Sequence, residues 1–204
     1  EGIPLRHASA QLGVGGKHIT EYLVALLHDR GRQVSPDSAR VIKENHGYVA
    51  LDYQTELKHF SETKLQYELP DGCLLSLHDE VFRCAEALFD PQLVGVSGSG
   101  IHAMINAAVA QSDVDIRQEL YGHVVLSGGT TLFKGMAERV ESELLALAPE
   151  AAHVRVIATQ ERKYAVWIGG SMLASLSTFN EMCVSKAEYD EHGFDIVRRR
   201  FAWA

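Results

Sequence analysis

The chain has 204 residues, of which 46% are hydrophobic and 23% are charged, and this balance excludes a disordered or fibrous protein. Its 27 acidic and 19 basic residues give a net charge of −8, which argues against a dedicated nucleic-acid binder and against a binder of anionic membranes. Three cysteines at spacings that match no zinc motif indicate reduced thiols, and no apolar stretch approaches the length of a membrane span.

In the first half of the chain, turn and cap residues separate short helical and strand patterns. Ser35 followed by Pro36 is typical of a helix cap and first turn. Pro70-Asp71-Gly72 places proline and glycine where a hairpin turn needs them. The expected elements are helices over residues 20–30 and 36–47, a strand over 48–51, hairpin strands over 65–69 and 73–77, and a helix over 80–89.

The second half continues the alternation of helices and strands. Ser185 with Glu188 has the spacing of a capping box. The expected elements are helices over residues 101–111, 114–120, 131–147 and 167–176, and strands over 123–126 and 154–158. Such alternation favours an α/β fold over a helical bundle or a β-sandwich.

The strongest local signal is the stretch Leu126-Ser127-Gly128-Gly129-Thr130-Thr131, where a buried strand is expected to pass through two glycines into a helix. Glycines there let a ligand approach the backbone, and the helix start offers free N–H groups. On these residues alone, a ligand site and a plain tight turn are equal alternatives. Residues 13–18 imitate a phosphate-binding loop, but Gln11 and His18 replace its first glycine and its hydroxyl, so that motif is rejected.

Two further groups of residues have a plain and a functional interpretation. Arg40, Lys43 and Glu44 share one helical face, and surface ion pairing is the default explanation, with a nucleotide edge as the alternative. Lys163 is expected to be solvated unless it lies beside a pocket. The ten histidines show no spacing suited to a protein metal site.

Several motifs, in the same order along the chain, resemble the C-terminal half of actin and actin-related proteins. The resemblance extends over essentially the whole chain, and the motifs are residues 67–72, 82–89, 100–102, 113–117, 126–131, 161–164, 167–171 and 173–179. The resemblance implies the actin-like ATPase fold of the actin, Hsp70 and sugar-kinase superfamily, with one lobe nearly complete and the other mostly missing. It places residues 1–14 and 97–164 in subdomain 3, 15–96 in subdomain 4, and 165–204 in the last part of subdomain 1.

The resemblance also assigns roles to individual residues. It implies ATP or ADP with a divalent cation (Mg²⁺ or Ca²⁺) in the complete fold, and leaves open whether this chain binds the nucleotide alone. The positions that match nucleotide-binding residues of the family are Gly16, Arg40, Lys43, Glu44, Gly129, Thr130, Leu132, Phe133 and Lys163. The phosphate loops and the cation site of the family have no counterpart here, so we expect no ATP hydrolysis by this chain on its own.

A partner groove is implied in the same way. One helical face carries Ile168, Met172, Leu173 and Leu176. Apolar residues with this spacing belong to a protein core more often than to a partner groove. The resemblance matches a groove for partner helices and filament loops to Gly2, Ile168, Met172, Leu173, Leu176, Thr178 and Met182. The implied partners are other actin-family subunits and actin-binding proteins, with no nucleic acid or membrane.

The implied function is that of an actin-family cytoskeletal protein in the cytoplasm, with the nucleus as a second compartment. The alternative is a non-catalytic actin-related scaffold subunit of a chromatin-remodelling or dynein-associated complex. A sugar-kinase-like enzyme is a remote third interpretation, because that superfamily shares the two-glycine turn at Gly128 and Gly129.

Overall fold

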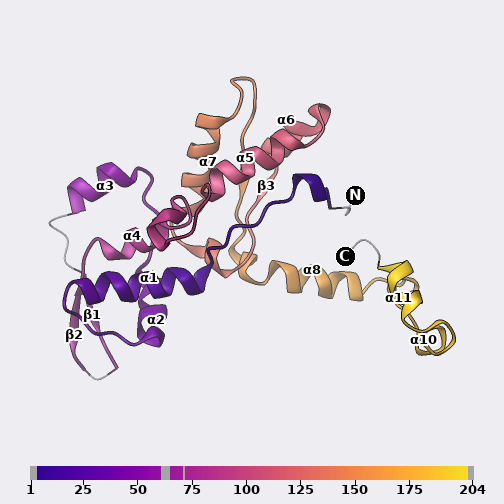
Figure 1. The fold of residues 1–204 in the computed structure, drawn as a ribbon, viewed down its shortest axis with the longest axis horizontal. Helices are drawn as coiled ribbons and strands as arrows, with labels where there is room; N and C mark the ends of the chain where they lie inside the picture. Colours follow the sequence, from indigo (N-terminus) through magenta and orange to yellow (C-terminus); the bar gives the residue numbers. More distant parts are fainter. Residues whose placement is uncertain (1–3, 61–64, 71, 202–204) are drawn as a thin grey trace.

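The computed structural model describes residues 4–60, 65–70 and 72–201. Figure 1 shows a group of short helices and a hairpin at one end of the molecule, a second group of helices around a small sheet in the middle, and the C-terminal helices extending away from both. None of the described helices is long and apolar enough to cross a membrane.

The first group is built around α1 (Gly16–Asp29), which packs against α2 (Pro36–His46) and α4 (Glu80–Glu86). The hairpin strands β1 (Leu65–Glu68) and β2 (Leu74–Leu77) pair antiparallel beside them, as the sequence predicts. Phe82 of α4 is fully buried, and the rings of Tyr48, Tyr53 and Phe60 lie 5.3–5.8 Å from its ring. Aromatic burial of this kind supplies much of the stability of such a small unit.

The second group is a parallel β–α–β arrangement with two added helices. Strand β3 (Val124–Val125) pairs parallel with β4 (Val156–Ile157), and α7 (Met136–Leu147) connects them. Helix α5 (Ile101–Gln111) packs against α7, and α6 (Arg117–Gly122) leads into β3. The fold therefore mixes helices with one parallel and one antiparallel strand pair among the described residues, which is compatible with the α/β class expected from the sequence.

The C-terminal helices α8 (Ala165–Ala174), α9 (Phe179–Met182), α10 (Lys186–His192) and α11 (Phe194–Arg200) contain no buried residue. In Figure 1, α8 leads away from the rest of the molecule to α10 and α11. The predicted capping box is present at the start of α10, where Ser185 and Glu188 bond to each other's backbone N–H. Arg200 of α11 donates to Glu188 at 2.8 Å and so holds the last two helices together.

The structure differs from the predicted elements at several places. Residues 48–51 form no strand, and only a single bridge joins Tyr48 to Lys134 there. The helix expected over residues 131–147 begins only at Met136, because Gly135 adopts a left-handed conformation (φ 82°) that separates it from the preceding turn. Helix α3 (Tyr53–His59), capped by the Asp52 carboxylate, was not predicted.

Candidate nucleotide site

A cavity of about 450 Å³ lies where the start of α1, the end of α2 and the turn after β3 meet. This volume is in the range of small-molecule sites. Its lining includes eight of the nine positions predicted to bind a nucleotide, together with one residue that the sequence analysis missed: Gly16, Lys43, Glu44, Asn45, Gly129, Thr130, Leu132, Phe133 and Lys163.

Lys43 is the buried cation of this cavity, with a side chain that is fixed by neutral oxygens. Its Nζ donates to the carbonyl of Gly16 at 2.8 Å and to Oγ1 of Thr20 at 2.9 Å. Burial lowers the pKa of Lys43, although the neighbouring Glu44 carboxylate opposes that shift. A cation held without a bound carboxylate keeps part of its charge available for an anionic ligand.

The turn after β3 takes its shape from glycines and from one arginine. Gly128 has φ 93°, which favours glycine, and Gly129 begins the short 3₁₀ turn Gly129–Leu132. Arg162 clamps the turn, since its guanidinium donates to the carbonyl of Thr131 at 3.1 and 3.2 Å and its own carbonyl accepts from the Gly128 N–H at 2.9 Å. This clamp brings Lys163, the next residue, to the cavity.

One wall of the cavity is apolar. Phe133 is almost fully buried, whereas Leu132 is 41% exposed. A Cβ at Gly47 would lie 2.6 Å from the Phe133 ring, so the absence of a side chain at the end of α2 lets that ring pack there. The wall can therefore support a flat apolar group such as a nucleobase.

The polar groups of the cavity can bind an anion that also carries hydroxyl groups. Gly16 is the first residue of the 14-residue helix α1, so the positive end of that helix faces the cavity together with Lys43 and Lys163. A Cβ at Gly16 would lie 3.1 Å from Thr130 Oγ1 and 3.5 Å from Lys43 Nζ, so a side chain there would fill the space between α1 and the turn. Glu44 supplies a carboxylate that can accept from hydroxyl groups.

Comparison with protein-family models matches residues 37–202 to actin, which is more than half of the chain. The chain belongs to the actin family. Proteins of this family generally bind ATP or ADP with a divalent cation, and the cavity has the features such a ligand needs: an apolar wall, two lysines, a helix start and a carboxylate. The matched range includes every predicted nucleotide position except Gly16.

The lining of this actin-family cavity differs from the predicted set at two residues. Arg40, predicted with the others, does not line the cavity; its side chain is 60% exposed and lies 4.0 Å from the Asp37 carboxylate. Asn45 does line it, and its place directly after Glu44 near the end of α2 is the signal that could have indicated it. No group of three or more His, Cys, Asp or Glu side chains suited to a metal ion occurs among the described residues.

Most of the residues predicted to form a partner groove belong to the C-terminal segment of this actin-family chain. Met172, Leu173, Leu176, Thr178 and Met182 are exposed on or beside α8 and α9, and Ile168 is half-buried. Gly2 lies outside the described residues. Met172, Leu173, Leu176 and Met182 are therefore exposed apolar side chains in this structure and not part of its buried core.

Proposed function

We propose that this chain is the adenine-nucleotide-binding lobe of an actin-family cytoskeletal protein that forms filaments or associates with them. The observation that carries the proposal is the 450 Å³ cavity, because residues far apart in the sequence, from Gly16 to Lys163, meet there with the chemistry of a nucleotide site. Family membership makes adenine nucleotides the first ligands to test.

Each part of the lining has a role in this proposal. Phe133 and Leu132 would pack against the base, and Glu44 would accept from the ribose hydroxyls. Lys43 and the start of α1 at Gly16 would face the phosphates, and Lys163 would cover the ligand from the clamped turn. A divalent cation, when bound with the phosphates, would neutralise part of their charge; the chain's own residues provide binding and orientation.

Calorimetric titration of the full chain with ATP and ADP tests the nucleotide site. We expect Lys163→Ala and Glu44→Gln each to weaken binding about tenfold, because each removes one charged partner of the ligand. Arg40→Ala is the matched control, since it removes one positive charge from the same region but outside the cavity. Equal losses in Arg40→Ala and Lys163→Ala would indicate general electrostatic attraction and contradict the site.

We also propose that residues 165–204 belong to the second lobe of the actin fold, most of which is not part of these 204 residues. The support is the exposure of α8: Val166 is 82% exposed and Trp167 is 74% exposed. A helix that is apolar on all sides is normally covered on all sides. The remaining subdomain boundaries follow the resemblance: 1–14 and 97–164 in subdomain 3, and 15–96 in subdomain 4.

The cytoskeletal role is tested by sedimentation of the whole protein under polymerising salt. A pellet that depends on ATP and on Lys163 is the expected result, with the protein located in the cytoplasm on actin structures. A stable soluble complex with other subunits, in the cytoplasm or the nucleus, would contradict filament formation and support the scaffold alternative.

A further inference from the structure

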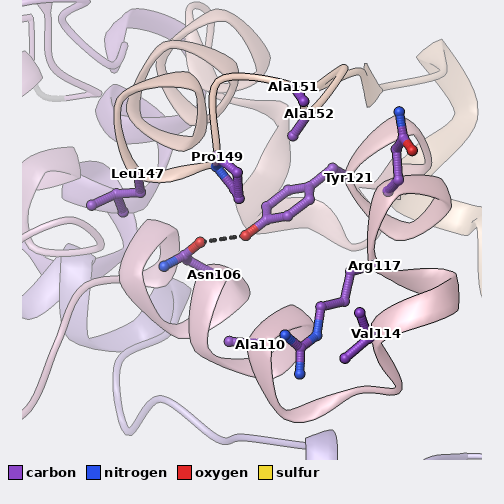
Figure 2. Close-up of a pocket in the computed structure, with 10 residues that line it drawn as sticks. Asn106, Ala110, Val114, Arg117, Tyr121, Leu147, Pro149, Ala151 and Ala152 are labelled. Atoms are coloured by element: carbon purple, nitrogen blue, oxygen red, sulfur yellow. Dashed lines mark hydrogen bonds between the residues drawn. The ribbon is translucent and has the colours of Figure 1, made fainter.

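A second cavity lies between α5, α6 and the segment that follows α7, as Figure 2 shows. Its volume is about 370 Å³, within the range of small-molecule sites. It shares no lining residue with the nucleotide cavity. The lining consists of Asn106, Ala110, Val114, Arg117, Gln118, Tyr121, Leu147, Pro149, Ala151 and Ala152.

The cavity forms where short side chains of α5 lie opposite longer side chains of α6 and of the segment after α7. Asn106 and Ala110 are four residues apart on α5 and so lie on one face of the helix. Leu147 and Pro149 close the opposite side, and Figure 2 shows the Tyr121 ring between them and α6. Tyr121 is only 5% exposed, and its hydroxyl donates to Oδ1 of Asn106 at 2.6 Å. The cavity wall is therefore fixed before any ligand arrives.

The polar groups of this cavity are mainly hydrogen-bond donors. Arg117 is the one charged residue in the lining, and no acidic residue accompanies it there. Its Nε donates to the Ser112 carbonyl at 2.9 Å, and the ion pairs found among the described residues do not include Arg117. The terminal nitrogens of Arg117 and the amide nitrogen of Asn106 remain available to an acceptor.

Gln118 adds one more amide group, and apolar side chains make up most of the remaining lining. Ala110, Leu147, Pro149, Ala151 and Ala152 offer no charge and no side-chain hydrogen bond. A ligand with an uncharged, apolar body and an anionic end therefore matches this lining. For the protein as a whole, with its net charge of −8, anions are repelled rather than attracted, so binding of an anion here needs a local cation such as Arg117.

We propose that this cavity is a second ligand site that binds a small organic monoanion, such as an aromatic or branched aliphatic carboxylate, with its carboxylate on Arg117 and its apolar body against Ala110 and Leu147. The site is independent of the nucleotide cavity, so either proposal can fail without the other.

Binding of 2-naphthylacetate to the full chain, followed by saturation-transfer NMR and titration, tests the site. The neutral probe 2-naphthylacetamide has the same ring and lacks the charge. We expect the carboxylate to bind about tenfold more tightly than the amide, and Arg117→Gln to abolish that difference. Addition of ATP should leave the binding of 2-naphthylacetate unchanged.

Two variants on the same helix separate filling of the cavity from damage to the fold. Ala110→Leu places a larger side chain in the cavity and should weaken 2-naphthylacetate binding about tenfold or more. Ala107→Leu is the matched control, since Ala107 is exposed on α5 outside the cavity and should leave binding unchanged. Equal binding of the acid and the amide, equal effects of the two leucine variants, or no binding at millimolar concentration would each overturn the proposal.

Discussion

Gly47 follows the last residue of α2 at the point where the Phe133 ring reaches the candidate nucleotide cavity. A Cβ at this position would lie 2.4 Å from the Lys43 carbonyl oxygen and 2.6 Å from Cε1 of Phe133. Its backbone is extended (φ −66°, ψ 140°), so the need for glycine here comes from close contacts and not from an unusual φ. One missing methyl group thus sets the distance between α2 and the apolar wall.

We therefore expect Gly47→Ala to destabilise the protein by about 1–3 kcal/mol, as overpacking of a filled site does. Urea unfolding measures the change. Gly170→Ala is the control, because a Cβ at Gly170 in α8 meets no atom within 4 Å and alanine favours a helix interior by about 0.5–1 kcal/mol. If the two alanine variants change stability alike, the close packing of Gly47 against Phe133 is wrong.

A buried ion pair joins the first group of helices, at α4, to the second group, at α7. Arg139 of α7 donates from its two terminal nitrogens to the carboxylate of Glu86 on α4, at 2.9 and 3.1 Å. The same guanidinium donates to the Ala50 carbonyl at 2.7 Å and to Glu143 at 2.7 Å, and it lies over the ring of Phe89. Both members of the pair are buried, so each depends on the other for its charge.

We expect Arg139→Leu to lower the free energy of unfolding by about 3–5 kcal/mol at neutral pH, because it leaves the Glu86 carboxylate buried and unpaired. Burial already raises the pKa of Glu86, and Arg139 opposes that shift. Without Arg139 the folded-state pKa rises further above the unfolded value. The folded state then binds more protons across that interval, so the stability of the variant falls as pH rises through it.

Urea unfolding of wild type and Arg139→Leu at a series of pH values from about 4.5 to 7 tests this sign. The stability gap between the two proteins should be largest at pH 7 and should narrow toward acid pH. The double variant Glu86→Leu/Arg139→Leu is the control, since it removes both charges and should lose the pH dependence that the single variant shows. A gap that stays constant over the pH range would rule out Glu86 as its source.

Sequence patterns predicted those elements whose signals are local. The caps at Ser35 and Ser185 and the turn near Gly72 mark α2, α10 and the hairpin, because the bonds that define them lie within a few residues. The prediction of a strand over residues 48–51 was wrong, because a strand needs a neighbouring segment to pair with and only Lys134 provides one bridge. Pairing of that kind is set by the tertiary fold and not by local pattern.

The candidate nucleotide site could be predicted only in part from local chemistry. The glycine turn and the Lys43 helix each had a plain alternative, and it was the ordered resemblance to actin that joined them with Gly16 and Lys163. Asn45 was not predicted, because no motif includes it and only its place directly after Glu44 points to it. The second cavity could not be predicted at all, since three segments of the chain create it and no single pattern includes Asn106, Arg117 and Pro149.

The exposed C-terminal helices α8 to α11 lie outside the buried core of the chain. The buried core ends at Val154, and α8 to α11 add no buried side chain to it. Replacing the exposed apolar side chains of α8 should then change the free energy of unfolding of the 204-residue chain by no more than about 0.5 kcal/mol. Since we propose that residues 165–204 belong to a second lobe, the same substitutions should destabilise a polypeptide that contains that lobe by several kcal/mol more, on the order of a core substitution.

Trp167 reports directly on whether α8 is covered. The chain has two tryptophans, so Trp203→Phe leaves Trp167 as the single emitter, with 74% of its surface exposed. In the monomeric 204-residue chain, acrylamide should quench its emission nearly as strongly as that of a free tryptophan derivative. In a longer polypeptide that contains both actin lobes, quenching should fall several-fold and the emission should shift to shorter wavelength, because the indole leaves water.

Leu173→Asn, on the same helix and 51% exposed, should leave quenching in the short chain unchanged and restore it in the longer one. A protected Trp167 in the short chain, at concentrations where sedimentation shows a monomer, would mean that α8 is covered by its own chain and that residues 165–204 do not need a second lobe.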